Sequence, residues 1–146
     1  MVISFPSDTE DTIDAIREAI GRNVTFVTVS SIACTASGCG LDPITNTSIN
    51  SFCTTCSGLY WIPNLSNYSV KAHVTWGNAD QLNWVTGGQL FEGDCRVQVK
   101  YTTEVLTAIE GTDHVIVDGK NFEIQSKIYR GVPELNRVLL DLIERE

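Results

Sequence analysis

Four cysteines in two close pairs constrain this chain more than any other feature of its sequence. In order they are Cys34, Cys39, Cys53 and Cys56, with thirteen residues between the pairs. Gaps of four and two residues within the pairs let each pair turn two thiolates toward one metal ion, and both gaps occur in structural zinc sites. A glycine or serine follows each second cysteine, which suits a turn whose backbone N–H groups face the sulfur atoms. The spacing predicts a closed four-cysteine zinc site with no coordination position left for water or substrate.

Two other uses of paired cysteines are disulfide bonds and a redox dithiol. Disulfide bonds need an oxidising compartment, and the first residues are not typical of a secretory signal. Four Asn-x-Ser/Thr triplets would be glycosylation sites only in a secreted protein. A redox Cys-x-x-Cys motif usually opens a helix, whereas the residues after Cys56 are not typical of a helix. We therefore expect zinc in a structural role.

The charge of the chain argues against unassisted binding to nucleic acid. Its net charge is −8 at pH 7, and no lysine or arginine lies between Arg22 and Lys71. Contacts to phosphates require clustered basic residues. A length of 146 residues, 42% of them hydrophobic, supports one domain with a core of its own. No apolar run approaches the ~20 residues of a membrane span, so we expect no membrane contact.

The N-terminal residues predict one short amphipathic helix over 8–20. Ser7 and Glu10 have the spacing of a capping box, and Gly21 is expected to stop the helix in the C′ position. Apolar residues recur at intervals of three and four, the period of a helix. The stripe consists of Ile13, Ile16 and Ile20.

The middle of the chain predicts strands. Residues 24–29 and 59–62 are rich in β-forming residues and flank the cysteines, with Pro63 and Asn64 ending the second strand. Residues 68–76 and 95–101 alternate between apolar and polar, which places Cys95 in the core as an inert thiol. Residues 115–124 are typical of a hairpin with a type I′ turn at Asp118 and Gly119. Residues 86–93 and 102–112 are expected to be long loops.

The C-terminal segment predicts a second amphipathic helix. Pro133 suits the first position of a helix. Apolar residues then recur at three and four, whereas a strand would place apolar residues on both of its faces. These residues are Leu135, Val138, Leu139, Leu142 and Ile143.

Together these segments predict a mainly β protein. The expected fold is a small antiparallel β-barrel or sandwich with N-terminal and C-terminal amphipathic helices and a zinc-ribbon-like hairpin insertion. The expected segments are the N-terminal helix (1–23), the zinc-ribbon-like unit (24–66) and the barrel with its C-terminal helix (67–146), in one compact domain overall.

No arrangement of residues in the sequence predicts catalysis. There is no glycine-rich phosphate loop, because Gly87 and Gly88 precede neither Lys-Ser/Thr nor a helix. His114 lies beside Asp113, but no serine or cysteine nucleophile has a motif that would join them. We expect that the protein is not an enzyme.

The second half of the chain carries a family resemblance. It rests on Gly93-Asp94, the alternating strand that ends at Tyr101, the hairpin Val-Ile-Val-Asp-Gly-Lys-Asn-Phe-Glu-Ile, and the closing Leu-Ile-Glu-Arg. Over residues 68–146 the chain resembles head–tail connector proteins of tailed bacteriophages, closest to the head-closure (stopper or neck) type. The cysteine-rich segment is not part of that family pattern. The family members are structural, and no catalytic residue is carried over.

The resemblance implies a virion protein of the phage neck, made in the host cytoplasm. It implies a homo-oligomeric ring of six or twelve subunits that contacts portal, adaptor and tail proteins and joins or closes their channel. DNA would pass through this ring without specific binding, and an acidic lumen would let it slide. The alternative is a zinc-ribbon binding module for nucleic acid or a host protein.

Overall fold

A computed structural model describes residues 6–77, 83–85, 88–90, 94–132 and 134–145, without the side chains of 83–90. The chain forms two compact units where one compact domain was expected. We call residues 29–66 the cysteine unit, and residues 1–28 and 67–146 the barrel unit. Each is described by itself.

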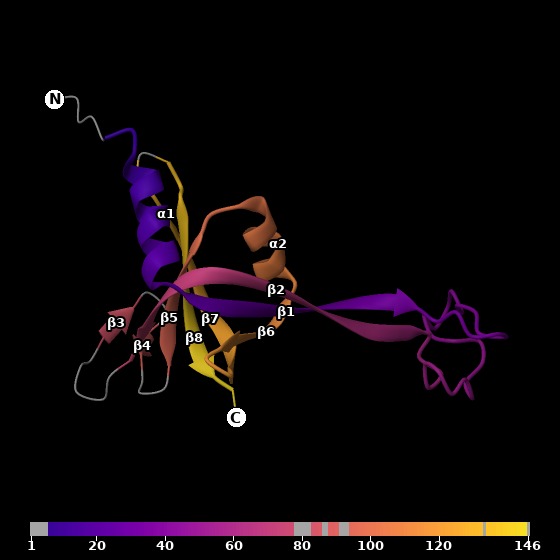
Figure 1. Cartoon of the computed structure of the whole chain (residues 1–146). Coiled ribbons are helices and arrows are strands. Elements are labelled where there is room, and N and C mark those ends of the chain that lie inside the picture. Colours follow the sequence, from indigo (N-terminus) through magenta and orange to yellow (C-terminus); the bar gives the residue numbers. More distant parts are fainter. Residues whose placement is uncertain (1–5, 78–82, 86–87, 91–93, 133, 146) are drawn as a thin grey trace. The chain divides into compact units, whose positions relative to one another are not determined.

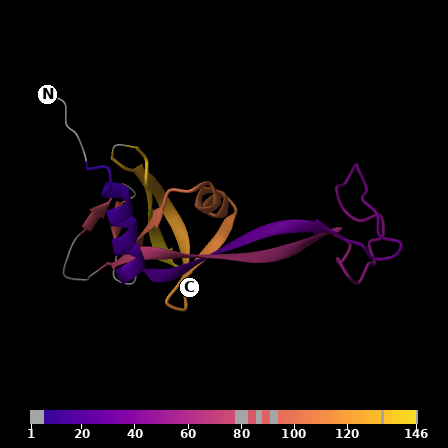
Figure 2. The same cartoon turned by 45° about the horizontal axis from the view of Figure 1, so that its top comes forward.

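The barrel unit is built on a closed antiparallel β-barrel of six strands in the order β1-β2-β5-β8-β7-β6 (Figures 1 and 2). The strands are β1 (Arg22–Ala33), β2 (Trp61–Trp76), β5 (Cys95–Lys100), β6 (Thr112–Val117), β7 (Lys120–Arg130) and β8 (Arg137–Glu144). Two short strands, β3 (Asn83–Val85) and β4 (Gly88–Leu90), pair with each other. The helices are α1 (Thr9–Ile20) and α2 (Thr103–Glu110). The prediction of a mainly β protein with an antiparallel barrel is confirmed.

The barrel core follows the predicted alternation of side chains. In β5 the fully buried residues are Cys95, Val97 and Val99, and the residues between them point outward. The hairpin turn is also confirmed, because Asp118 and Gly119 have φ values of 50° and 81°, as a type I′ turn requires. Val117 and Lys120 face each other across this turn.

The prediction of a C-terminal helix is wrong, because residues 137–144 form the strand β8. β8 lies between β5 and β7 and pairs with both. Val138, Leu140 and Leu142 fill the barrel core. On the outer face, Asp141 is covered by a bidentate ion pair with Arg96 of β5, at 2.6 and 3.1 Å. Pairing on two sides therefore outweighs the helical spacing of the apolar residues.

The prediction of a long loop over 102–112 is also wrong, because these residues contain α2. The Thr102 side chain caps the helix by accepting a hydrogen bond from the Val105 N–H at 3.3 Å. Val105, Ala108 and Ile109 are buried and join the barrel core. The predicted loop over 86–93 is replaced at 88–90 by β4, and its other residues lie outside those described.

Pro63 and Asn64 do not end the return strand, since β2 continues through them to Trp76. β2 pairs with β5 at residues 73–76, so Pro63 lies outside that stretch of the ladder. Its missing N–H therefore leaves the pairing of β2 with β5 intact.

α1 occupies the predicted residues, but its ends and its buried face differ from the prediction. Asp8 is the N-cap residue and makes no side-chain capping bond, so the predicted capping box does not form. Gly21 ends the helix with an extended backbone rather than a left-handed one. The buried side chain of α1 is Arg17 at 5% exposure, while Ile16 is 53% exposed.

Candidate metal centre

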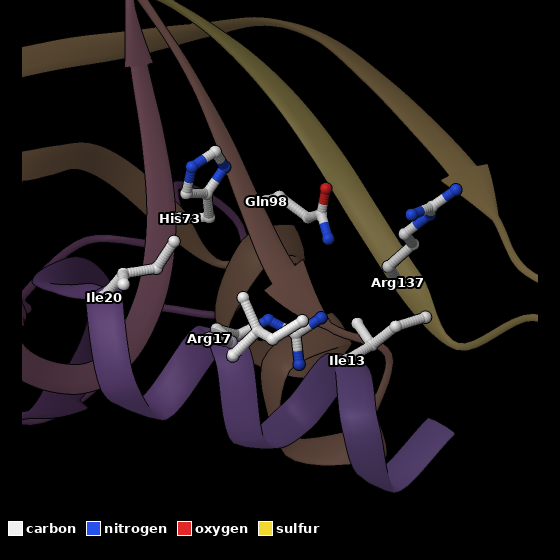
Figure 3. Close-up of a pocket in the computed structure, with 7 residues that line it drawn as sticks. Ile13, Arg17, Ile20, His73, Gln98 and Arg137 are labelled. Atoms are coloured by element: carbon white, nitrogen blue, oxygen red, sulfur yellow. The ribbon is translucent and has the colours of Figure 1, made fainter. Parts of the chain in front are cut away.

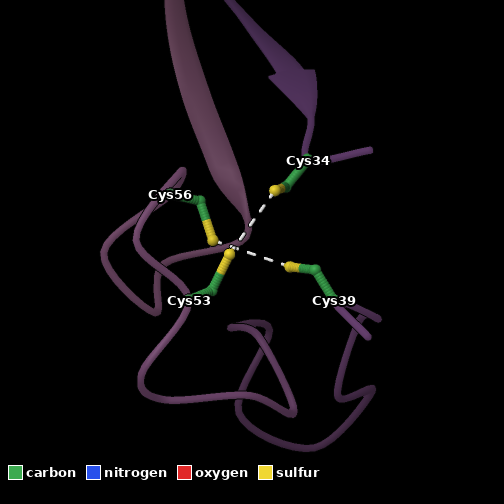
Figure 4. Close-up of side chains that lie close together, drawn as sticks. All are labelled: Cys34, Cys39, Cys53 and Cys56. Carbon is green, nitrogen blue, oxygen red and sulfur yellow. Dashed lines mark hydrogen bonds between the residues drawn. The ribbon is translucent and has the colours of Figure 1, made fainter. Parts of the chain in front are cut away.

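The four predicted cysteines converge on one point of the cysteine unit (Figure 4). Cys34 follows directly after β1, and Cys56 lies shortly before β2. All four Sγ atoms lie within 4.8 Å of one another, with 3.9 Å between Cys34 and Cys53 and 3.6 Å between Cys39 and Cys56. The cluster can hold a metal ion.

These separations fit a tetrahedral tetrathiolate site. A Zn–S bond length of about 2.3 Å places the sulfur atoms of a regular tetrahedron about 3.8 Å apart. The two closest pairs lie within a few tenths of an ångström of that spacing. A disulfide would need about 2.05 Å. Cys34, Cys53 and Cys56 are buried and Cys39 is half-buried, so the thiols are largely shielded from water.

Backbone N–H groups around the cluster support thiolates. Hydrogen bonds from the backbone N–H groups of Cys56 and Thr55 lower the pKa of the Cys53 thiol to about 6. The Cys34 sulfur accepts a bond from the backbone N–H of Ala36, which lowers the pKa of this thiol, although burial and the neighbouring thiols raise that pKa overall. Cys34 is itself held in place because its N–H donates to the carbonyl of Tyr60 at 2.8 Å. These amides orient the sulfur atoms as outer-shell partners do in metal sites.

Ser48 is a member of this site that the sequence analysis missed. Its side chain is buried, and its Oγ lies 3.1 Å from the Cys39 sulfur while accepting the Asn50 N–H at 3.1 Å. The Ser48 hydrogen bond lowers the pKa of the Cys39 thiol, but burial and the neighbouring thiols raise it to about 12. A divalent cation would offset this rise in the pKa, because its positive charge favours the thiolate form in which cysteine binds a metal.

The turn after Cys56 requires a residue without a side chain. Ser57 and Gly58 both have left-handed backbones, with φ values of 52° and 79°. A Cβ on Gly58 would lie 2.8 Å from the carbonyl oxygen of Ser51. The Gly58 carbonyl accepts the Ser48 N–H at 3.0 Å, which links this turn to the outer shell of the cluster. In the first pair the left-handed residue is Gly38, before the second cysteine, rather than Gly40 after it.

The surface of the cysteine unit carries large apolar side chains among serine, threonine and asparagine residues, and it is almost free of charge. Ile44 and Phe52 are 92% and 93% exposed. Asp42 is the only charged residue among residues 29–66. The other large hydrophobic residues exposed on this unit are Val29, Ile32, Leu41, Ile49, Leu59, Trp61 and Leu65.

Within the part of the chain that the structure describes, the remaining candidates for chemistry do not assemble into a site. His114 Nδ1 and Asp113 Oδ2 are 2.9 Å apart, and Asp113 also pairs with Arg145. Trp61 packs on Tyr60 in the cysteine unit, and Trp76 packs on Phe122 in the barrel unit. Cys95 is fully buried, and burial followed by the charges of nearby carboxylates raises the pKa of its thiol to about 12.

The sequence matches no protein-family model and no curated protein. Among the residues that the structure describes, neither helix has the length and apolar character needed to cross a membrane.

Proposed function

We propose that this protein is a structural component of a tailed-phage virion. In this proposal it is a subunit of the neck ring, of the head-closure type, and it joins or closes the channel between portal or adaptor and tail. Two features support the proposal. The chain has a closed six-stranded barrel, of which all strands except β1 lie wholly or partly in the region 68–146 that carries the family resemblance, and it has a separate unit with exposed apolar side chains.

The exposure of Ile44 and Phe52 is the observation that carries the proposal. Large apolar side chains that are almost fully exposed are typical of protein–protein contacts. A nearly complete absence of charge adds to this, because charged residues are depleted at the centre of such contacts. The cysteine unit therefore acts as a docking element for a neighbouring protein of the neck.

In the same proposal the metal ion is zinc, and its role is structural. Four thiolates complete a tetrahedral site, so no position remains for a substrate. Cys34, Cys39, Cys53 and Cys56 hold the ion, and Ser48 and the backbone amides hold the thiolates. The ion fixes the loops that display the apolar side chains. The protein thus works through its interfaces and not as an enzyme.

The alternative proposal is a zinc-ribbon module that binds another macromolecule outside a virion. The surface of the cysteine unit favours a host protein over nucleic acid in that case. It offers no lysine or arginine to a phosphate, and the barrel unit is acidic overall. Both proposals share the docking role of the cysteine unit, and they differ in the assembly that it serves.

Deleting the gene from the phage or prophage that encodes it decides between the two. We expect electron microscopy to show DNA-filled heads that leak or lack tails, and mass spectrometry to find the protein in wild-type particles. Normal tailed virions after deletion, with the protein absent from wild-type particles, would refute the virion role and favour the host-protein module.

Two sets of substitutions test the docking element within the particle. Ile44→Ser with Phe52→Ser removes the most exposed apolar side chains, and we expect it to abolish incorporation into particles. Thr45→Ser with Thr54→Ser changes neighbouring exposed positions and should leave incorporation normal. Metal content of both purified variants should equal that of the wild type, which separates lost docking from lost folding.

A further inference from the structure

A second site lies in the barrel unit, between α1 and the outer face of the barrel. It is a pocket of about 190 Å³ lined by three isoleucines of α1 and by Arg17, His73, Gln98 and Arg137. His73 and Gln98 face each other across β2 and β5, and Arg137 extends from β8 (Figure 3). None of these residues belongs to the metal centre, so a ligand site at this pocket does not depend on the proposed function.

Arg17 is the unusual member of this pocket. It is 5% exposed, yet only one of its terminal nitrogens has a partner among the described residues: Nη1 lies 2.6 Å from Asp14. Its Nε and Nη2 atoms are buried and without a partner in the described structure, as is the Nε of Arg137. A buried charged donor without an acceptor is costly, because it has lost its hydrogen bonds to water without gaining others. The unpaired N–H donors of Arg17 therefore indicate that a ligand supplies the missing hydrogen-bond acceptor.

The geometry of the free donors specifies the shape of that acceptor. Nε and Nη2 form one edge of the planar guanidinium, and this edge presents two parallel N–H groups. A carboxylate matches such a fork with two oxygens in one plane. Asp14 occupies another nitrogen and is in turn held by Lys100, so the ion pairs already present leave the fork free and fix its orientation.

The walls of the pocket specify what carries the carboxylate. Ile13, Ile16 and Ile20 line one side, and Ile16 and Ile20 remain more than half exposed. An aliphatic group placed against them would remove apolar surface from water. A phosphate could not use this wall, and its second negative charge would face the field of a chain with net charge −8.

We propose that this pocket binds a carboxylate carried by an aliphatic group, with Arg17 and Arg137 as the anion-binding residues. The carboxylate accepts the two free N–H groups of Arg17 and the Nε–H of Arg137, and the aliphatic group packs on the isoleucines of α1. Such a ligand is either the end of an apolar peptide segment of another protein or a free short-chain carboxylic acid.

The test is an NMR titration of the full-length protein with hexanoate, in which the Nε–H signals of both arginines are followed. We expect saturable shifts of the Arg17 and Arg137 Nε–H signals. Hexanamide, which has the same shape without the charge, should cause none. Arg137→Gln should weaken hexanoate at least tenfold, whereas Arg130→Gln, which removes an exposed arginine outside the pocket, should leave its affinity unchanged. Arg17→Gln should abolish binding if its melting temperature shows that it folds.

A second pair of ligands identifies the source of the carboxylate. The dipeptide acetyl-Ile-Leu with a free C-terminal carboxylate is compared with its C-terminal amide. Binding of the acid at least tenfold tighter than hexanoate assigns the site to a peptide segment, and hexanoate binding as tightly or more tightly assigns it to a free acid. The proposal is overturned if neither acid shifts the arginine signals up to about 10 mM, beyond the range of weak specific binding. It is also overturned if hexanamide binds as well as hexanoate.

Discussion

Removing the metal ion is expected to unfold the cysteine unit while the barrel unit stays folded. Each unit has its own set of buried residues. Among residues 29–66 the buried side chains are Cys34, Cys53, Cys56 and Ser48, so the thiol cluster forms nearly all of that core. None of the buried residues of the barrel core comes from this segment. A metal ion held by the four thiolates would therefore be the main attractive centre of the cysteine unit.

The expected size of the effect follows from the hydrogen bonds of the loop. Backbone N–H groups at Asp42, Ser48 and Ile49 donate to carbonyls at 2.8 to 3.0 Å. Each such bond contributes about 1 kcal/mol, while ordering each residue costs about 1–2 kcal/mol. Without the metal ion these amides should exchange within about tenfold of an unstructured peptide. With metal at a thousand times its Kd, protection should be at least about 10³-fold, or about 4 kcal/mol.

The measurement is hydrogen exchange followed by mass spectrometry, on the full chain with and without a chelator. Cys53→Ser removes one ligand and should reproduce the effect of the chelator at residues 34–59. Cys95→Ala is the matched control, since it removes a cysteine from the barrel core and should leave the metal content at one ion per chain. In the chelated wild type, protection in β5 and β8 should change by less than about 0.5 kcal/mol.

Three results would refute this reasoning. Loss of protection in the barrel strands on chelation would show that the units share one cooperative core. Full protection of residues 34–59 after complete removal of metal would show that the loop folds without the ion. Disulfide-linked peptides in unreduced protein, with no metal present, would replace the metal centre by two disulfide bonds.

Three further outcomes can be measured on the purified protein. Cys95 should not react with iodoacetamide in the native state at pH 8, because the thiol is buried and its pKa is raised to about 12, and it should react after unfolding. Asp141→Asn should cost about 2–3 kcal/mol in urea unfolding, because it breaks a buried ion pair with the partly exposed Arg96. Burial raises the pKa of Asp141, but hydrogen bonds from Arg96 and Ser126 lower it by more, so the pKa lies below its ordinary value. The wild type should therefore lose this stability as the pH falls below the ordinary carboxyl value of about 3.9, and the variant should not. Gly58→Ala forces a left-handed alanine against a carbonyl and should weaken zinc retention about tenfold, read by competition with a chromophoric chelator.

The cluster of four cysteines could be predicted because its signal is local in the sequence. The spacing of four cysteines fixes which atoms meet, and the structure brings all four sulfurs together. Ser48 could not be found in the same way. It is one of many serines and threonines in the loop, and it reaches Cys39 only because the Gly58 turn places the chain there. Outer-shell residues depend on the path of the backbone, which cysteine spacing does not specify.

The strands and turns of the barrel were predictable where the period was two. The Asp118-Gly119 turn and the alternation after Cys95 were both found. β8 was missed because its apolar residues also fit a helical period. Only the pairing with its two neighbouring strands shows that the segment is a strand and not a helix. α2 carried a usable signal, since Val105, Ala108 and Ile109 recur at three and four behind a threonine cap. Its eight residues are short enough to be taken for a loop.

The burial of Arg17 is the point at which sequence patterns fail most plainly. An apolar stripe on a helix predicts that the isoleucines face the barrel. The helix instead turns its arginine inward, where Asp14 and Lys100 form an ion-pair network with it. No periodicity rule places a charged residue at the centre of a contact. An arginine held by ion pairs beside partly exposed isoleucines fits the proposed binding site, because departures from sequence patterns are expected at functional sites.

Raising the salt concentration should affect binding at the two proposed surfaces differently, because one binds through charges and the other through apolar contacts. Raising the ionic strength from 0.1 to 1 M shortens the Debye length from about 10 Å to about 3 Å. The carboxylate pocket depends on Arg17 and Arg137, so hexanoate should bind several-fold more weakly at 1 M salt. The cysteine unit has Asp42 as its one charged residue, so its docking through Ile44 and Phe52 should hold or strengthen. Particles kept at 1 M salt should accordingly retain the wild-type protein when probed by mass spectrometry. Release of the protein by salt, with hexanoate binding unchanged, would show that the forces are assigned to the wrong surfaces.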